Sequence, residues 1–398
     1  MPDLAVIEHI AGQVAEMKRS GTHVILVSSG AVGAGRSLMP GLDDLSRVVR
    51  RQVLASLGQV KLMQIYDSFF GPKGFFCAQV LATKEDFRDR QHYINMKSCF
   101  LALQRDNIVP IVNENDVIAI DELMFTDNDE LAGLVAAMTG ADAVVNCVGT
   151  FDKSGKNNFE AVQAEGAARI ARIAAETGVA SLVHISAIGA SADAASRYSR
   201  TKAEGEAGVL RHFPGATILR PSVMFGPEDG FFNRFASMAR FGPVLSIVGG
   251  NTRFQPVYVD DVAQAAVAGI EGRASGTYEL GGPDVASFRD WIRQMLTVIL
   301  RRRLIVNLPF WVASIMGNLL DFGSALTGRL FPNKILTADQ VKTLKVDNVV
   351  AEGAKTLSDL GIAPTPAGAV LPDYLWRFRP SGQYDAIKAS AKNLRQHG

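Results

Sequence analysis

Cysteine is scarce in this chain of 398 residues, and neither sign of charge dominates. The three cysteines, Cys77, Cys99 and Cys147, are an odd number without metal-ligand spacing, which predicts no metal site and indicates a reducing compartment. The 41 Lys and Arg residues almost balance the 40 Asp and Glu residues, for a formal net charge of +1. This balance gives no global attraction to nucleic acid or to an anionic membrane, so neither is an expected partner.

A long apolar segment is also lacking. The longest uncharged run, residues 304–320, is shorter than the roughly 20 residues of a membrane-spanning helix and contains Asn307, Pro309 and Asn318. We expect a buried helix here, rather than a membrane-surface contact. The first residues include acids in an amphipathic pattern, unlike a signal peptide. The expected location is therefore the cytoplasm, with a peripheral position on a membrane complex as the alternative.

The chain does contain a regular alternation of helical and strand-like segments. Helical periodicity covers residues 3–20 and 47–70, and shorter elements follow residue 230. This order predicts an α/β protein with largely parallel, buried sheets, and a small substrate subdomain over about 230–380. The predicted strands cover residues 23–27, 77–82, 108–113, 143–148, 182–186 and 217–222.

A glycine-rich turn follows the first predicted strand, in the sequence HVILVSSGAVGAGRSLM at residues 23–39. Strand, glycine turn and helix is a common arrangement for holding a phosphate. However, Gly30, Gly33 and Gly35 have the spacing G-x-x-G-x-G, and no second strand ending in Asp or Glu follows about 20 residues later. A dinucleotide site at this turn therefore stays an alternative.

Residues 111–133 are rich in carboxylates and amides. Asp116 follows a predicted strand, and Asn128 starts a predicted helix that ends at Gly140. A carboxylate beside an amide and free helix N–H groups can hold a zwitterion, because the carboxylate attracts an ammonium while the donors take a carboxylate. The alternative is a helix cap beside a solvated acidic loop.

Several blocks in order over residues 24–142 resemble the glutamate 5-kinases of the amino-acid kinase family, which catalyse the first step of proline synthesis. These blocks include VILVSSGAVGAG, CAQVLATKEDFRDRQHYINM and VPIVNENDVIAIDELMFTDNDELAG. The resemblance implies that the first part of the chain binds L-glutamate. The residues that match the family's glutamate-binding positions are Ser29, Gly30, Asp116 and Asn128.

The nucleotide side of this family is not matched. Glutamate kinases begin with a strand ending in a Lys-x-Gly-Ser/Thr loop, and the resemblance here starts after that element. Their nucleotide-binding half follows the Gly-Ala-Asp turn, where this chain continues as AVVNCVGTFDKSGKNNF. Phosphoryl transfer depends on Lys, metal and backbone N–H groups. ATP and Mg²⁺ are therefore expected only if the kinase site were complete, and glutamate 5-kinase activity is an alternative.

A different pattern of polar residues begins after Ala143. Ser186 ends a predicted strand, and Tyr198 precedes Lys202 by four residues, so that the two side chains share one face of a helix. An ammonium beside a phenol should lower the pKa of Tyr198 and allow proton exchange with a carbonyl. Ser186 could hydrogen-bond the same oxygen. The alternative is an ordinary surface pair.

Residues 142–380 resemble short-chain dehydrogenase/reductases of the extended and atypical kinds, and most of all the NAD(P)-binding accessory subunit of respiratory complex I. The matching segments are DAVVNCVG, ILRPSVMFGPED, RFQPVYVDDVAQA and GTYELGGPD. The resemblance implies NAD(P)(H) as cofactor and Ser186, Tyr198 and Lys202 as catalytic residues. The resemblance also implies that the nucleotide can be a structural ligand without turnover, so the pair alone does not imply catalysis. The implied cofactor-binding residues are Asn146, Gly149, Tyr198, Lys202, Pro221 and Ser222.

This second family normally starts with a strand, a G-x-x-G-x-x-G turn and a helix. Kinase-like sequence occupies that place upstream of Ala143. We therefore predict a fusion of two truncated, Rossmann-like parallel-sheet units, a glutamate-binding part at 1–142 and an NAD(P)-binding part at 143–398. Weak NAD(P)(H) binding or oxidoreductase chemistry is the first expectation, and a non-catalytic assembly module is a further alternative. Unpaired sheet edges would favour a homo-oligomer.

Overall fold

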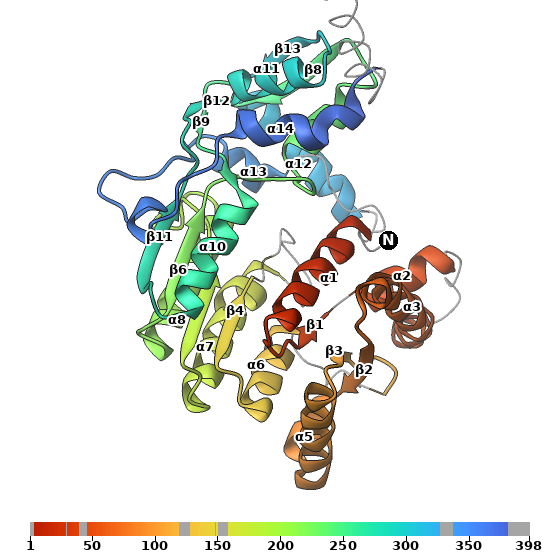
Figure 1. Ribbon diagram of the computed structural model, residues 1–398. Coiled ribbons are helices and arrows are strands. Elements are labelled where there is room, and N and C mark those ends of the chain that lie inside the picture. Colours follow the sequence, from red (N-terminus) through yellow and green to blue (C-terminus); the bar gives the residue numbers. More distant parts are fainter. Residues whose placement is uncertain are drawn as a thin grey trace, which may run out of the picture. The chain divides into compact units, whose positions relative to one another are not determined.

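The structure is a computed structural model that describes residues 4–28, 30–39, 46–118, 128–147, 149, 158–326 and 337–380 (Figure 1). The chain divides into two compact units. The first unit consists of Met1–Val144 and Ser154–Ala180, and the second unit consists of Val145–Lys153 and Ser181–Gly398.

A three-stranded parallel sheet forms the centre of the first unit. Its order is β1 (Leu26–Val27), β3 (Val109–Glu114) and β2 (Cys77–Ala82). All six residues of the central strand β3 are buried. The predicted strands are confirmed here, except that only the last two residues of 23–27 are paired.

Helices cover both faces of this sheet. Neighbouring residues of β3 point to opposite sides, so Ile111 packs in one core with Leu62 and Phe70, whereas Val112 packs in another with Phe100. The helices of the first unit are α1 (Leu4–Arg19), α2 (Ala31–Leu38), α3 (Arg47–Phe70), η1 (Gly71–Lys73), α4 (Lys84–Arg88), α5 (Arg90–Arg105), α6 (Asn128–Thr139), η2 (Glu160–Gly166) and α7 (Ala167–Glu176).

Two glycines let α2 and α3 approach closely. A Cβ added to Gly35 would lie 1.9 Å from the carbonyl oxygen of Leu54, and one added to Gly58 would lie 1.7 Å from that of Ala31. Any side chain at either position would force the two backbones apart. The glycine-rich turn therefore serves helix packing at Gly35.

A second sheet has the order β11-β6-β5-β4, formed by Gly276–Leu280, Thr217–Pro221, Ser181–Ile185 and Ala143–Asn146, and all of it except Ala143 and Val144 belongs to the second unit. Strand β6 pairs in parallel with both β11 and β5, as predicted. Helix α10 (Val259–Ile270) packs on β5 and β6, and helix α8 (Arg197–His212) supplies the polar groups considered below. The strands that precede Ala143 form a separate sheet, so the glycine turn after β1 does not extend the sheet that carries β5.

Shorter elements complete the second unit around an aromatic core. Phe225, Phe232, Phe288 and Trp291 lie in one buried cluster. The elements are β7 (Met224–Phe225), α9 (Phe232–Met238), β8 (Val244–Val248), β9 (Arg253–Phe254), β10 (Val257–Tyr258), β12 (Ala286–Ser287), α11 (Phe288–Val298), β13 (Leu304–Leu308), α12 (Phe310–Leu326), α13 (Ala338–Thr343), η3 (Ser358–Leu360), α14 (Ala367–Leu375) and η4 (Trp376–Phe378).

The expected buried helix over residues 304–320 is wrong. Its first five residues form β13, which pairs with β8, and Pro309 separates this strand from α12. The side chains of Trp311, Ile315 and Leu319 are 68%, 54% and 64% exposed. None of the helices in the described ranges is long and apolar enough to cross a bilayer.

The contact between α2 and α3 predicts a large difference between two glycine substitutions. Gly58→Ala places a methyl group against the backbone of Ala31 and should lower the free energy of unfolding by about 1–3 kcal/mol. Gly33→Ala is the control, because its Cβ meets no atom within 4 Å. It should leave stability unchanged or raise it by up to about 1 kcal/mol. Urea unfolding followed by circular dichroism measures both; equal effects would contradict the close approach.

Candidate functional site

The carboxyl ends of the strands in the first sheet lie at one edge, because the strands are parallel. Ser28 follows β1, Thr83 follows β2, and Asp116 lies two residues after β3. Loops at this edge are the usual ligand-binding position in parallel α/β sheets. The sequence predicted Asp116 at this position.

Arg51 of α3 neutralises Asp116. Its Nε and Nη2 atoms donate to Asp116 Oδ1 over 3.0 and 2.7 Å, and Nη2 lies 3.5 Å from Glu114 Oε2. The Asp116 side chain is 9% exposed. Sequence reasoning missed Arg51, because an arginine on a predicted helix carries no signal of which strand end it reaches. The pair offers a carboxylate for an ammonium and a guanidinium for a carboxylate.

Further hydrogen bonds order the same edge. Ser28 Oγ and Tyr66 Oη are 2.8 Å apart, and Asn113 Nδ2 donates to Gln59 Oε1 over 3.1 Å. Gly30 precedes α2 with φ of +112°, a left-handed conformation that favours glycine. Of the predicted glutamate-binding residues, Ser29 and the side chain of Asn128 lie outside the described residues.

In the second unit, the side chain of Lys202 lies between the residues that follow β4 and the end of β5. Its buried Nζ atom donates to the carbonyl oxygen of Ile185 over 3.1 Å. A Cβ added to Gly149 would lie 3.7 Å from the same nitrogen. Asn146, the last residue of β4, is also buried. The structure thus brings Lys202 close to Gly149 and to the carboxyl end of β5.

Ser186 is engaged by a carboxylate. Its hydroxyl donates to Glu206, which also receives Arg220 Nε and Nη2 over 2.9 and 2.6 Å. Arg220 Nη1 lies 3.3 Å from Glu279 Oε1. Sequence reasoning missed Glu206, although it lies one helical turn after Lys202 on α8. In this arrangement the Ser186 hydroxyl donates to a carboxylate rather than to a substrate carbonyl.

The expected activation of Tyr198 is wrong. Burial raises the pKa of this phenol to about 12, whereas the spacing to Lys202 predicted a lowered pKa. The backbone N–H groups of Arg197 and Tyr198 donate to the two carboxylate oxygens of Asp339 over 2.9 and 3.1 Å. Asp339 therefore caps the beginning of α8, a contact between residues 142 positions apart that the sequence did not indicate.

The predicted cofactor residues after β6 are bound to another segment of the second unit. Ser222 Oγ donates to Asn348 Oδ1 over 2.6 Å, and the carbonyl oxygen of Pro221 accepts the N–H of Ile188 over 3.0 Å. Both residues lie at the carboxyl end of β6, as the sequence predicted.

His184 on β5 is buried, and neither ring nitrogen has a hydrogen-bond partner among the residues that the structure describes. Burial, and to a smaller extent the positive charge of Lys202, lower the pKa of this imidazole to about 3. The ring is therefore neutral near pH 7. Sequence reasoning passed over His184, which reads as an ordinary strand residue.

These features define an α/β protein with a Rossmann-like second unit. Residues 102–300 match the model of the RmlD substrate binding domain, and residues 1–151 match that of the amino acid kinase family. The chain belongs to the RmlD substrate binding domain family, whose model covers half of it. The amino-acid-kinase and dehydrogenase resemblances of the sequence are thereby confirmed.

Individual relatives divide between the same two groups. The chain is 50% identical over 159 residues to glutamate 5-kinase of Chlorobaculum tepidum, covering 39% of this chain and 44% of that protein. It is 34% identical over 273 residues to NADH dehydrogenase (ubiquinone) 1 alpha subcomplex subunit 9, mitochondrial, of Arabidopsis thaliana, covering 67% of this chain and 68% of that protein. The solved UDP-glucose 4-epimerase of Thermus thermophilus in complex with NAD shares 15% identity, with a TM-score of 0.46 and coverage of 76% and 99%.

The buried neutral imidazole predicts acid sensitivity. The folded pKa of His184 is about 3 and the unfolded one about 6.5, so between these values the unfolded chain binds the additional proton. The His184 contribution to stability is present above about pH 6.5 and is lost on acidification toward pH 3, by at most about 1.4 kcal/mol per pH unit. Urea unfolding of His184→Leu between pH 7 and 4 should show a shallower loss than the unsubstituted chain. Parallel profiles would contradict this role.

Proposed function

We propose that the second unit binds NAD(P)(H) weakly at the carboxyl edge of β4, β5 and β6. The observation that carries the proposal is the buried Lys202 ammonium beside Gly149 and the end of β5. The missing Cβ of Gly149 leaves room for a ligand atom near this cation. Asn146, Gly149 and Lys202 would hold the nucleotide, and the nicotinamide would supply a hydride in oxidoreductase chemistry.

Turnover should be slow in this arrangement. A phenol with a pKa of about 12 does not release its proton readily near neutral pH, and Ser186 already donates to Glu206. Oxidoreductase chemistry by Ser186, Tyr198 and Lys202 would require both groups to turn toward a substrate carbonyl. Binding without efficient turnover is therefore the better supported role.

A titration with NADPH tests the binding site. Lys202→Ala removes the cation, and the dissociation constant should rise by about tenfold, equivalent to about 1.4 kcal/mol, because an ionic contact to the nucleotide is lost. Lys202→Arg should retain part of the affinity. NADPH fluorescence measures binding, and circular dichroism establishes that each variant is folded.

Lys342→Ala provides the matched control, because Lys342 is an exposed residue of α13. It should bind NADPH like the unsubstituted chain. An absence of fluorescence change at millimolar NADPH, or equal affinity for Lys202→Ala and the control, would refute the proposal.

We infer a second role for the first unit, the binding of L-glutamate at the edge formed by β1 and β3. The Arg51–Asp116 pair supports it, since it presents opposite charges for the two ends of an amino acid. The sequence after Ala143 resembles the dehydrogenase family where the kinase resemblance implies a nucleotide-binding half. Phosphoryl transfer to glutamate is accordingly not expected.

Thermal unfolding tests glutamate binding. Millimolar L-glutamate should raise the melting temperature of the unsubstituted chain, since a ligand that binds the folded state stabilises it. Asp116→Ala should abolish the rise by removing the partner of the ammonium. Asp106→Ala is the control, because Asp106 pairs with Arg105 at an exposed position of the same unit. An equal rise in both variants would contradict the assignment.

A third role is docking on a larger assembly, favoured by the exposed Trp311, Ile315 and Leu319 of α12. The NADPH titration separates this role from the first, because a folded chain that binds no nucleotide would leave docking as the better account.

We also propose that the boundary between the two resemblances lies at residue 142. This position falls within residues 102–151, which both family models match.

A further inference from the structure

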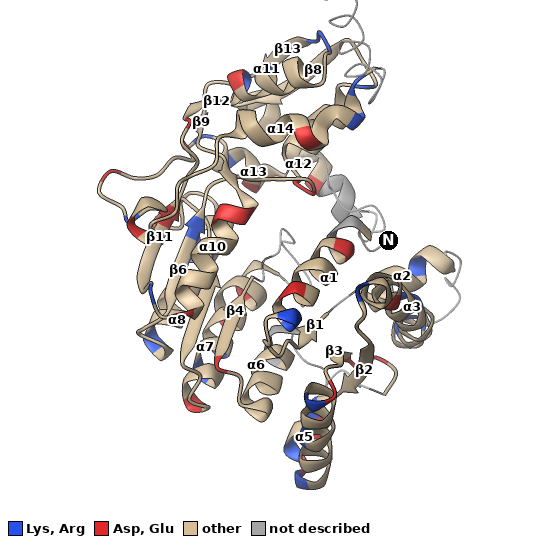
Figure 2. Ribbon diagram, viewed as in Figure 1, with Lys and Arg blue, Asp and Glu red and all other residues tan. Residues whose placement is uncertain are grey.

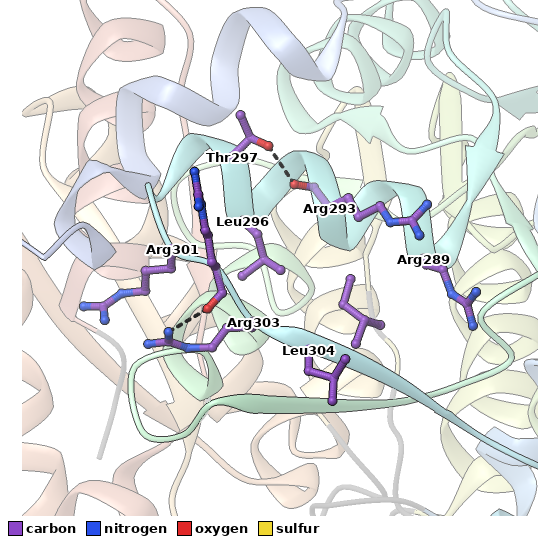
Figure 3. A pocket seen from close by; sticks show the side chains of 9 residues that line it. Arg289, Arg293, Leu296, Thr297, Arg301, Arg303 and Leu304 are labelled. Atoms are coloured by element: carbon purple, nitrogen blue, oxygen red, sulfur yellow. Dashed lines mark hydrogen bonds between the residues drawn. The ribbon is translucent and has the colours of Figure 1, made fainter.

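A cleft in the second unit is lined mainly by arginines (Figure 3). It has a volume of about 470 Å³ and lies between α11 and the segment that leads into β13. In Figure 2 the turn before β13 is drawn in blue. Five of the nine lining residues are arginines and none is acidic: Arg289, Arg293, Leu296, Thr297, Arg301, Arg302, Arg303, Leu304 and Ile305.

Little negative charge balances this cluster. Arg293 Nη1 lies 2.9 Å from Asp290 Oδ1, and within the described ranges none of the other four arginines has a carboxylate within 4 Å. Arg301 Nε donates to the carbonyl oxygen of Phe378 over 2.8 Å, and Arg303 Nε donates to that of Ala239 over 2.8 Å. These carbonyls orient the guanidinium groups but do not neutralise them.

Two further observations favour the binding of an anion in this cleft. The Nε atom of Arg289 is buried and has no hydrogen-bond partner in the described part of the chain. An unsatisfied buried donor is costly unless a ligand or water meets it. The pKa of Arg301 is lowered by burial and also by the positive charges of Arg303 and Arg240. The cluster therefore contains mutually repelling cations.

The backbone holds these cations together. Leu300 has φ of +54°, and the chain turns there from α11 toward β13. The pairing of Leu304 with Val244 then fixes the start of β13. Helix α11 contributes two arginines to the cleft and the turn contributes three, so two elements supply its positive charge. Such a like-charged cluster is stabilised when an anion binds between its members.

We propose that this arginine cleft binds a phosphate group, carried by a soluble phosphate ester or by a lipid headgroup. A phosphate group offers several acceptor oxygens and up to two negative charges, which suit a cleft lined by several arginines. A single carboxylate has two oxygens and one charge, and it would leave most of these donors unmet. None of the lining residues belongs to the carboxyl edge of β4, β5 and β6, so this site is separate from the nucleotide site proposed above.

Calorimetric titration of the full chain with pyrophosphate tests the proposal. The double substitution Arg289→Gln/Arg302→Gln removes a buried unsatisfied donor and an exposed arginine. It should raise the dissociation constant at least about tenfold, because two charge-assisted contacts are lost. Arg211→Gln, at an exposed position on α8, should bind pyrophosphate like the unsubstituted chain.

The single variant Arg302→Gln serves if circular dichroism shows that the double variant is misfolded, and it should weaken binding several-fold. Equal affinity in the cleft variants and Arg211→Gln would overturn the proposal, as would no binding at millimolar pyrophosphate. Both results are independent of NADPH binding, which is measured with the Lys202 variants.

Sedimentation with phosphatidylcholine vesicles, with and without phosphatidic acid, distinguishes the two sources of phosphate. Sedimentation that requires phosphatidic acid and is lost in Arg289→Gln/Arg302→Gln identifies a lipid headgroup. Pyrophosphate binding without sedimentation identifies a soluble phosphate ester. Sedimentation that is unchanged in the double variant would overturn the lipid source, and with equal pyrophosphate binding it would overturn the site.

Discussion

The second unit depends on one buried carboxylate. Glu206 of α8 accepts the Ser186 hydroxyl at the end of β5 and two guanidinium nitrogens of Arg220 from β6. Arg220 reaches Glu279 on β11, and Glu279 accepts the N–H of Ala351 over 2.8 Å. A helix, three strands and a distant loop are thereby held by charge-assisted hydrogen bonds. The position of α8, and with it that of Lys202, follows from this network.

The same network limits the chemistry at the sheet edge. A serine that donates to a carboxylate and a half-buried phenol with a raised pKa are poorly suited to moving protons, which is why we propose binding rather than turnover. In the first unit, Arg51 and Asp116 likewise satisfy each other.

Much of the architecture could be predicted from periodicity, because parallel strands buried on both faces have strong local signals. The bounds of β2 and α3 agree with the predicted segments. Partners from distant elements could not be predicted: Arg51, Glu206, Asp339 and Asn348 act across tens of residues or more. The pKa of Tyr198 was predicted in the wrong direction, because spacing on a helix shows a neighbour but not the burial that outweighs it. The prediction of a buried helix over residues 304–320 was wrong for a similar reason, since an apolar run does not reveal which side chains remain exposed.

The bounds of the first structural unit differ from the boundary that we propose between the two family resemblances. Helix α7, which only the RmlD model matches, packs on α6, which lies within residues 102–151 that both family models match. A Cβ added to Gly133 of α6 would lie 3.3 Å from Ile173 of α7. A gene cut at codon 142 would thus separate two helices that share a hydrophobic contact, and the shorter product would expose what α7 covers. The proposed boundary at residue 142 therefore lies within a structural unit whose helices α6 and α7 share a core contact.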